Sequence, residues 1–242
     1  MFPFIATALA EGAEEKTPGW LSTVFAKFGS ILPTVWAIVA VLVLAAVILF
    51  VLSRSKKRWN AQMLANGALS IALAFVLSYI RLYKMPQGGS ITLASMLPVF
   101  LFSYAYGVGP GLFVGLAYGA LQWMQDGFWM LTPVEGVMDY LLAYAVLGLC
   151  GVAGKLGKLQ PAVKLTIGCV IGALARAVVA VTAGVIFFAD YAPEGQAPIV
   201  YSLLYNGLYL LPDTLICLAV GLPISQRVLK IMPTASISCR TL

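Results

Sequence analysis

Long uncharged stretches, separated by short polar or charged segments, dominate the pattern of hydrophobic and polar positions along the chain. A helix needs roughly 20 mostly apolar residues to cross the hydrocarbon core of a bilayer. The stretches predict seven transmembrane helices, at about residues 29–53, 61–80, 85–106, 110–125, 134–153, 165–189 and 199–223. The uncharged run 85–125 counts as two spans because its Gly- and Pro-containing segment 106–110 interrupts a helix. We therefore predict an all-α, polytopic membrane helix bundle.

Composition supports this fold class and excludes several others. The chain is 61% hydrophobic and only 10% charged, whereas an average soluble domain carries about 25% charged residues. A soluble enzyme, a disulfide-rich secreted scaffold and a disordered protein are therefore excluded. The chain has no His, which is the commonest metal ligand and general base. Its four cysteines show no metal-binding or disulfide spacing, and we interpret them as small apolar side chains (Cys150, Cys169, Cys217 and Cys239).

The positions of Lys and Arg predict the orientation in the membrane. Ten basic residues fall in the loops after the first and fifth spans and behind the last span: Arg54, Lys56, Lys57, Arg58, Lys155, Lys158, Lys164, Arg227, Lys230 and Arg240. Basic residues accumulate on the cytoplasmic side of membrane proteins. We therefore expect a multi-pass protein of the cell membrane with its N-terminus outside and its C-terminus in the cytoplasm. The net charge of +6 follows from these loops and does not require nucleic acid as a partner.

Three ionisable residues lie inside predicted spans, where a charge is costly and therefore suggests a function. They are Asp139, Arg176 and Asp213. One interpretation pairs Asp139 with Arg176 as a structural ion pair between helices. The other makes them opposite walls of a polar cavity that opens outward. The sequence alone leaves both interpretations open.

Aromatic residues cluster in the outer halves of the predicted spans. Tyr201, Tyr205 and Tyr209 repeat every four residues and so share one helix face. Such residues commonly form belts at the membrane interface, but a belt does not explain the adjacent Asp139 and Tyr140 or the polar pair Tyr201 and Asn206. These residue types suit a flat, cationic, hydrogen-bonding ligand.

Two further observations bear on mechanism. The chain has no phosphate-binding loop, no metal cluster and no pairing of a nucleophile with a base. We therefore expect a protein that is not an enzyme, needs no cofactor and does not power transport by itself. In the second predicted span, Ala68 and Ala72 show the small-xxx-small spacing that allows helices to approach closely. This spacing serves either internal packing or contact with a partner.

Five short motifs occur in a specific order along the chain. They are Gln87-Gly88-Gly89-Ser90 followed by Pro98, Asp139-Tyr140, Gly184-x-x-Phe187-Phe188, Tyr191-Ala192-Pro193-x-Gly195 and Tyr201-Ser202-x-x-Tyr205-Asn206. Together they resemble the thiamine-specific S components of energy-coupling factor (ECF) transporters, the ThiT/YuaJ family. The resemblance covers about residues 61–242.

The resemblance implies a six-helix membrane subunit that captures thiamine from outside and works with a transmembrane coupling subunit and two ATPase subunits. Ala68 and Ala72 match the family's docking motif for the coupling subunit. The residues that match ligand-binding positions are Tyr118, Trp129, Asp139, Tyr140, Arg176, Phe188, Tyr201 and Asn206. By this match Asp139 faces the charge and amino group of thiamine, Arg176 its hydroxyethyl or phosphate end, and the aromatic residues its rings.

The chain departs from the family pattern at two places. The family usually has His four residues after the basic position, where this chain has Ala180. The family pattern also begins near Ala61, so residues 1–60 form an additional segment with one extra transmembrane helix and a basic loop, ahead of the binding domain 61–242. The alternatives are an S component for another vitamin or a thiamine precursor, a self-sufficient secondary carrier, and a purely structural membrane protein.

Overall fold

The computed structural model describes residues 60–86, 88–127 and 133–231. The predicted extra helix at 29–53, the basic loop behind it, Gln87, Trp129 and Cys239 lie outside the described residues.

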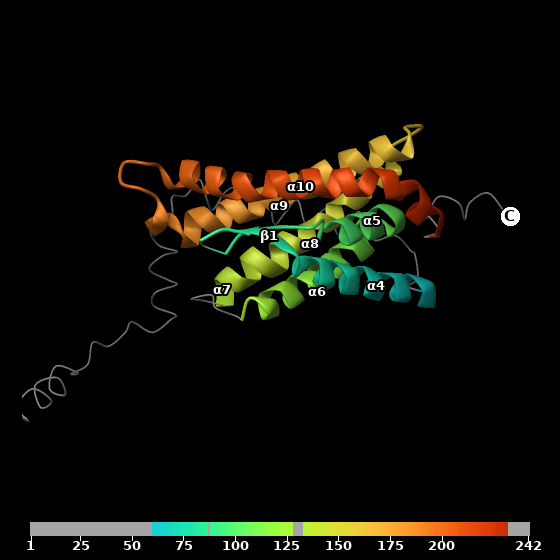
Figure 1. Cartoon of the computed structure of the whole chain (residues 1–242), viewed down its shortest axis with the longest axis horizontal. Coiled ribbons are helices and arrows are strands. Elements are labelled where there is room, and N and C mark those ends of the chain that lie inside the picture. The colour runs from blue at the N-terminus through green and yellow to red at the C-terminus, as the bar shows by residue number, and fades with distance from the viewer. Residues whose placement is uncertain (1–59, 87, 128–132, 232–242) are drawn as a thin grey trace, which may run out of the picture.

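Helices make up most of the described chain and pack side by side as one bundle (Figure 1). In chain order the elements are α4 (Ala61–Ser78), β1 (Arg81–Lys84), β2 (Ser90–Thr92), α5 (Leu97–Tyr106), α6 (Val108–Gln125), α7 (Pro133–Gly136), η1 (Val137–Leu142), α8 (Ala143–Ala145), η2 (Val146–Lys155), α9 (Pro161–Phe187), η3 (Ala189–Tyr191) and α10 (Pro198–Ile231). The segments α7, η1, α8 and η2 follow one another without a gap and together form one continuous helical segment. This architecture confirms the predicted helical membrane bundle.

Within the described ranges, four helical segments are long and apolar enough to cross a membrane. They are α4, residues 134–155, α9 and the part of α10 up to Ile224. The predicted break at 106–110 is confirmed, because α5 ends at Tyr106 and Gly107 adopts a φ of 94° before α6 begins. The predicted span at 85–106 is wrong in its first half, because helix begins only at Leu97.

A small antiparallel hairpin takes the place of that missing half-span. Strands β1 and β2 pair with Arg81 opposite Thr92 and Lys84 opposite Ser90. The turn between them contains Gly88 with a φ of 104°, in the left-handed region that Gly adopts more readily than other residues. The absence of charge in this segment therefore reflects a turn that packs on the bundle rather than a transmembrane helix.

Helix α5 forms the centre of the bundle. All ten of its residues are buried, and Phe100 and Phe102 are fully enclosed. A helix that is apolar on every side has to be surrounded by other helices, and α5 packs against α4, α6, η2, α9 and α10. The outer face of α10 instead exposes Leu204, Leu208 and Leu215, as expected for a surface that faces lipid.

Helix α6 approaches the π-helical segment η1 very closely at Gly119. A Cβ atom at this position would lie 2.6 Å from the carbonyl oxygen of Tyr140, so only Gly allows the two backbones to approach in this way. The contact fixes the position of Tyr140 and its neighbour Asp139. A π-helical turn is rare and occurs frequently at functional sites.

We expect the substitution Gly119→Ala to lower the stability of the bundle by about 1–3 kcal/mol, because the added methyl group has to displace backbone. The matched control is Gly207→Ala in α10, where nothing lies within 4 Å of the added Cβ. This control should be neutral or stabilising by up to about 1 kcal/mol, since Ala favours helix over Gly. Thermal unfolding of both variants in detergent measures the difference, and equal stability of the two would contradict the packing argument.

Candidate ligand-binding site

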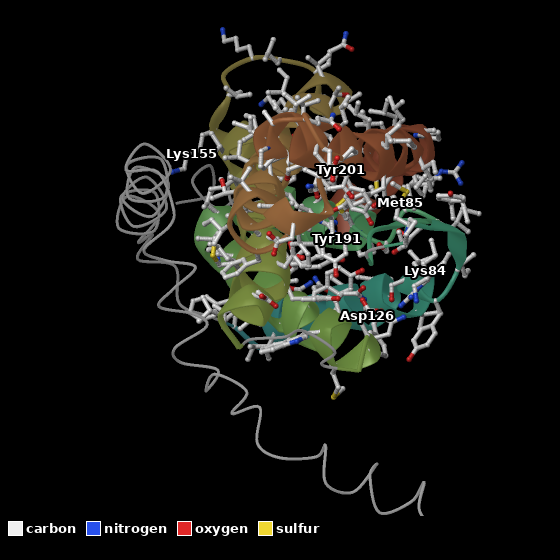
Figure 2. The ribbon with its side chains drawn as sticks, turned by 90° about the vertical axis from the view of Figure 1, so that its left-hand side faces the viewer. Lys84, Met85, Asp126, Lys155, Tyr191 and Tyr201 are labelled. Atoms are coloured by element: carbon white, nitrogen blue, oxygen red, sulfur yellow. The ribbon has the colours of Figure 1, made fainter. Side chains whose placement is uncertain are left out.

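A pocket opens at the end of the bundle where α6 and α9 end and α10 begins. The empty space between its walls, counted together with the open solvent at its mouth, is about 790 Å³. Its walls consist of Gly88, Gly89, Ser90, Gln122, Asp126, Asp139, Tyr140, Tyr144, Arg176, Ala180, Gly184, Phe188, Tyr191, Tyr201, Ser202, Tyr205, Asn206 and Tyr209. Figure 2 looks onto this end of the bundle, where the labelled Asp126, Tyr191 and Tyr201 lie.

Two helices each contribute one face to the pocket. On α9, the lining residues Arg176, Ala180, Gly184 and Phe188 follow at intervals of four, the last of them at the C-cap. On α10, the tyrosines at 201, 205 and 209 follow the same spacing, and adjacent rings lie 6.0 and 6.1 Å apart between centroids. Residues four apart lie on one side of a helix. Each helix therefore has a row of pocket-lining residues along one of its faces.

Asp139 lies in the π-helical segment η1 and lines the pocket. In the described part of the chain, the single ion pair joins Arg81 to Asp126, so Asp139 and Arg176 do not form the structural pair that one interpretation of the sequence proposed. No hydrogen bond from a described residue reaches the Asp139 carboxylate either. The Asp139 carboxylate is therefore available to interact with a ligand in the pocket.

Arg176 is the cationic counterpart across the pocket and is only 8% exposed. Its guanidinium carbon lies 4.0 Å from the centre of the Tyr144 ring, and Nη1 donates to the Met96 sulfur at 2.9 Å. An aromatic face stabilises a cation, whereas a thioether is a weak acceptor. A buried guanidinium held in this way keeps hydrogen-bonding capacity for an acceptor in the pocket.

Asn206 lies within a chain of hydrogen bonds on α10. Its Nδ2 donates to the Ser202 carbonyl oxygen at 2.9 Å and lies 3.2 Å from Ser202 Oγ. The Tyr209 hydroxyl donates to Asn206 Oδ1 at 2.8 Å, and Ser202 Oγ donates to the Val181 carbonyl on α9 at 3.0 Å. These bonds fix the orientation of the Asn206 amide before any ligand arrives.

The turn of the β1–β2 hairpin packs onto this polar wall. A Cβ atom at Gly89 would lie 2.7 Å from two ring carbons of Tyr209, so Gly is required for the turn to lie against the ring. Gly88, Gly89 and Ser90 all line the pocket. The hairpin thereby forms part of the pocket wall that helices alone do not provide.

Most of the residues predicted from the sequence come together in this pocket. Asp139, Tyr140, Arg176, Phe188, Tyr201 and Asn206 all line it, and Trp129 lies outside the described residues. Tyr118 does not line the pocket. It is fully buried behind Tyr144, with its ring packed edge-on at 5.0 Å between centroids. Tyr118 therefore supports the wall that Tyr144 forms.

Sequence reasoning missed several lining residues as site members. Tyr144, Tyr205 and Tyr209 follow predicted site residues at intervals of three or four along their helices, so helical spacing was a signal that could have assigned them. The turn residues Gly88, Gly89 and Ser90 lie in one of the five motifs, which was a signal that could have assigned them. No comparable signal existed for Asp126, because its place in the wall depends on contacts between distant segments. The predicted docking pair Ala68 and Ala72 is exposed on the outside of α4, away from the pocket.

Comparison with known proteins gives a consistent result. The family model described as thiamine transporter protein (Thia_YuaJ) matches residues 64–232. The thiamine transporter ThiT of Bacillus subtilis is 34% identical over 165 residues, which cover 63% of this chain and 84% of that protein. The thiamine transporter ThiT of Lacticaseibacillus paracasei is 27% identical over 170 residues, 63% of this chain and 81% of that protein.

A solved structure of ThiT from Listeria monocytogenes superposes with a TM-score of 0.61 at 25% sequence identity. The superposition covers 71% of this chain and 97% of that one. The family match spans well over half of the chain and includes every residue of the pocket, and the structural match supports the same fold. The chain therefore belongs to the thiamine transporter protein family.

Proposed function

We propose that this protein is the thiamine-binding S component of an energy-coupling factor transporter. The observation that carries the proposal is a pocket walled by a row of aromatic rings, with a carboxylate at Asp139 that forms no ion pair or hydrogen bond with a described residue. Thiamine consists of two flat aromatic rings joined by a methylene group, and one of these rings carries a fixed positive charge. Aromatic faces and a carboxylate are the groups that attract such a cation.

The family resemblance implies which part of the ligand each residue would contact. Asp139 and Tyr140 face the charge and amino group, while Phe188 stacks against a ring. Tyr201 and Asn206 provide polar contacts, and Arg176 faces the hydroxyethyl or phosphate end. Arg176 is buried and has no ion-pair partner among the described residues, which supports its role toward an electron-rich group.

The pocket would open to the outside of the cell. Helix α9 is 27 residues long, begins close to Lys155, Lys158 and Lys164, and ends with Phe187 at the pocket. At 1.5 Å per residue this separates the two ends by about 40 Å, enough to cross a bilayer. Because basic loops favour the cytoplasmic side, the pocket at the opposite end faces outward.

Import then requires partner subunits, because the sequence contains no phosphate-binding loop. We propose that a transmembrane coupling subunit docks on the exposed face of α4 at Ala68 and Ala72, and that two ATPase subunits drive release into the cell. Small residues on an exposed helix face allow another helix to approach closely. Large apolar residues, among them Leu69, Leu73 and Val76, expose about half of their surface around this pair.

The first prediction concerns the Asp139 carboxylate. Asp139→Asn should weaken thiamine binding by about tenfold to a hundredfold, the usual value of a hydrogen bond or contact to a charged group. The fold should persist, because no described residue depends on the carboxylate. Isothermal titration measures the affinity, and Asp190→Asn, an exposed carboxylate outside the pocket, is the matched control. Equal affinities of the two variants would remove Asp139 as the counter-charge.

The second prediction concerns the identity of the ligand, because this chain has Ala180 where the family usually has His. In a competition panel of thiamine, thiamine phosphates, its pyrimidine and thiazole halves, riboflavin and biotin, thiamine and its phosphates should bind most tightly. Arg176→Gln should weaken the phosphates more than thiamine itself, because the phosphates carry the additional negative charge. Preference for one half or for another vitamin would support an S component for a different ligand instead.

The third prediction separates binding from transport. Ala68→Trp should leave thiamine affinity unchanged and abolish uptake in vesicles that contain the coupling and ATPase subunits with ATP, because the large ring blocks docking. Ala219→Trp, on the exposed surface of α10, is the matched control and should transport normally. Uptake by vesicles that contain this chain alone would support a self-sufficient carrier and refute the proposed dependence on partners.

A further inference from the structure

Asp213 is an intramembrane carboxylate that the proposed binding site does not use. It is 2% exposed and does not line the pocket. Its Oδ1 accepts hydrogen bonds from both the backbone N–H and the hydroxyl of Thr92, each at 2.9 Å. Thr92 ends strand β2, so this buried carboxylate on α10 is bonded to the base of the hairpin. Burying a carboxylate is costly, and such a group is retained where its hydrogen bonds hold another part of the structure in place.

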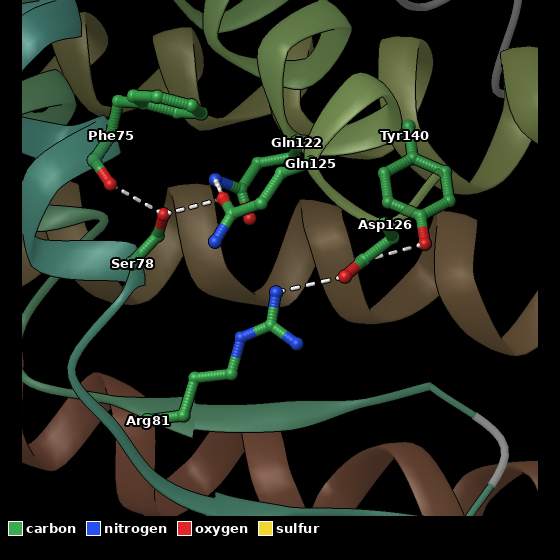
Figure 3. A network of polar contacts seen from close by, with 7 residues as sticks. All are labelled: Phe75, Ser78, Arg81, Gln122, Gln125, Asp126 and Tyr140. Carbon is green, nitrogen blue, oxygen red and sulfur yellow. Dashed lines mark hydrogen bonds and ion pairs between the residues drawn. The ribbon is translucent and has the colours of Figure 1, made fainter. Parts of the chain in front are cut away.

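A second carboxylate holds the other strand of the same hairpin. Arg81 begins β1, and its Nη2 lies 2.8 Å from Asp126 Oδ1 at the end of α6. The second oxygen of Asp126 accepts from the Tyr140 hydroxyl at 2.9 Å, so the ion pair continues into the pocket wall (Figure 3). The Ser78 hydroxyl lies 2.8 Å from Gln125 Oε1 and adds a contact between the ends of α4 and α6.

The two attachments meet at one place in the hairpin. Arg81 and Thr92 lie directly opposite each other in the strand register. This pair of residues is therefore bonded to α6 through Arg81 and to α10 through Thr92. The chain just beyond Thr92 is strained, because Ala94 adopts a φ of 57°. Strain of this kind persists where the surrounding contacts over-determine the backbone.

The turn at the other end of the hairpin has different surroundings. Its residues Gly88, Gly89 and Ser90 line the pocket, and Gly89 lies against the Tyr209 ring. The position of this turn over a ligand depends on the position of the base from which it extends. Neither Arg81 nor Thr92 lines the pocket. Thr92 therefore acts on a ligand through the hairpin, whereas Arg81 also holds Asp126, which lines the pocket and accepts from Tyr140.

We infer that Asp213 and the Arg81–Asp126 ion pair are positioning groups, which hold the hairpin by its base from opposite sides and thereby retain the bound ligand in the pocket. The identity of the ligand, thiamine, rests on the proposed function. The attachment of the hairpin does not, because it is a property of the protein without ligand.

Thr92→Val and Arg81→Gln test the two attachments separately, and neither replaces a residue that lines the pocket. Val keeps the backbone N–H and the shape of Thr but removes the hydroxyl bonded to Asp213. Each variant should release thiamine about tenfold faster in stopped-flow measurements, as expected for the loss of one hydrogen bond to a charged group. Thr92→Ser and Arg81→Lys, which retain the donors, should release thiamine at close to the original rate. Lys84→Gln removes an equal charge from β1 without breaking either attachment and should leave release unchanged.

Hydrogen exchange of the ligand-free protein supplies the readout that is independent of thiamine. Amides of residues 81–92 should exchange faster in Thr92→Val and Arg81→Gln than in Lys84→Gln, while those of α5 should keep their protection. Unchanged exchange and release in both variants would overturn the inference, and so would faster exchange without faster release. If the unaltered protein binds no thiamine, the proposed function is wrong, and the exchange experiment still decides whether the two carboxylates hold the hairpin.

Discussion

The cost of a charge in an apolar interior is the constraint on which the rest of this structure depends. A charged side chain inside a helix bundle needs a partner, a hydrogen-bond donor or acceptor, or an open cavity. Asp213 meets this requirement through Thr92, and Asp126 meets it through Arg81 and Tyr140. Asp139 and Arg176 meet it by lining the pocket. The first group bonds separate segments of the chain to one another, and the second faces the pocket, which Asp126 also lines.

The packing of the apolar helices allows the charged residues to fall into these two groups. Helix α5 lies in the centre of the bundle with every residue buried, and the long helices α9 and α10 pack along it and along each other. At Gly119 the backbones of α6 and η1 come so close that the π-helical turn with Asp139 is held in place. Among the described residues, most of the pocket wall therefore lies on helices, whereas Gly88, Gly89 and Ser90 belong to the hairpin.

Particular residues show how far sequence reasoning reached in the fold and the site. The helix break at Gly107 and the row of Tyr201, Tyr205 and Tyr209 followed from local rules of glycine conformation and helical spacing. The hairpin did not, because residues 85–92 carry no charge and therefore merge with the uncharged run of the helix that follows. Asp126 escaped notice as a site residue because a carboxylate directly after a predicted span is also typical of an exposed helix end.

The sequence by itself determined the membrane class, most of the helical segments, the identity of the rare intramembrane charges and the family to which the chain belongs. These properties depend on composition, on spacing within single helices and on the order of short motifs. Only the tertiary structure decided that Asp139 and Arg176 line a pocket without pairing, that Tyr118 lies behind its wall, and that Asp213 holds the hairpin. The physical reason is the distance along the chain. Thr92 and Asp213 are 121 residues apart, and no local pattern encodes which segments meet when the helices pack.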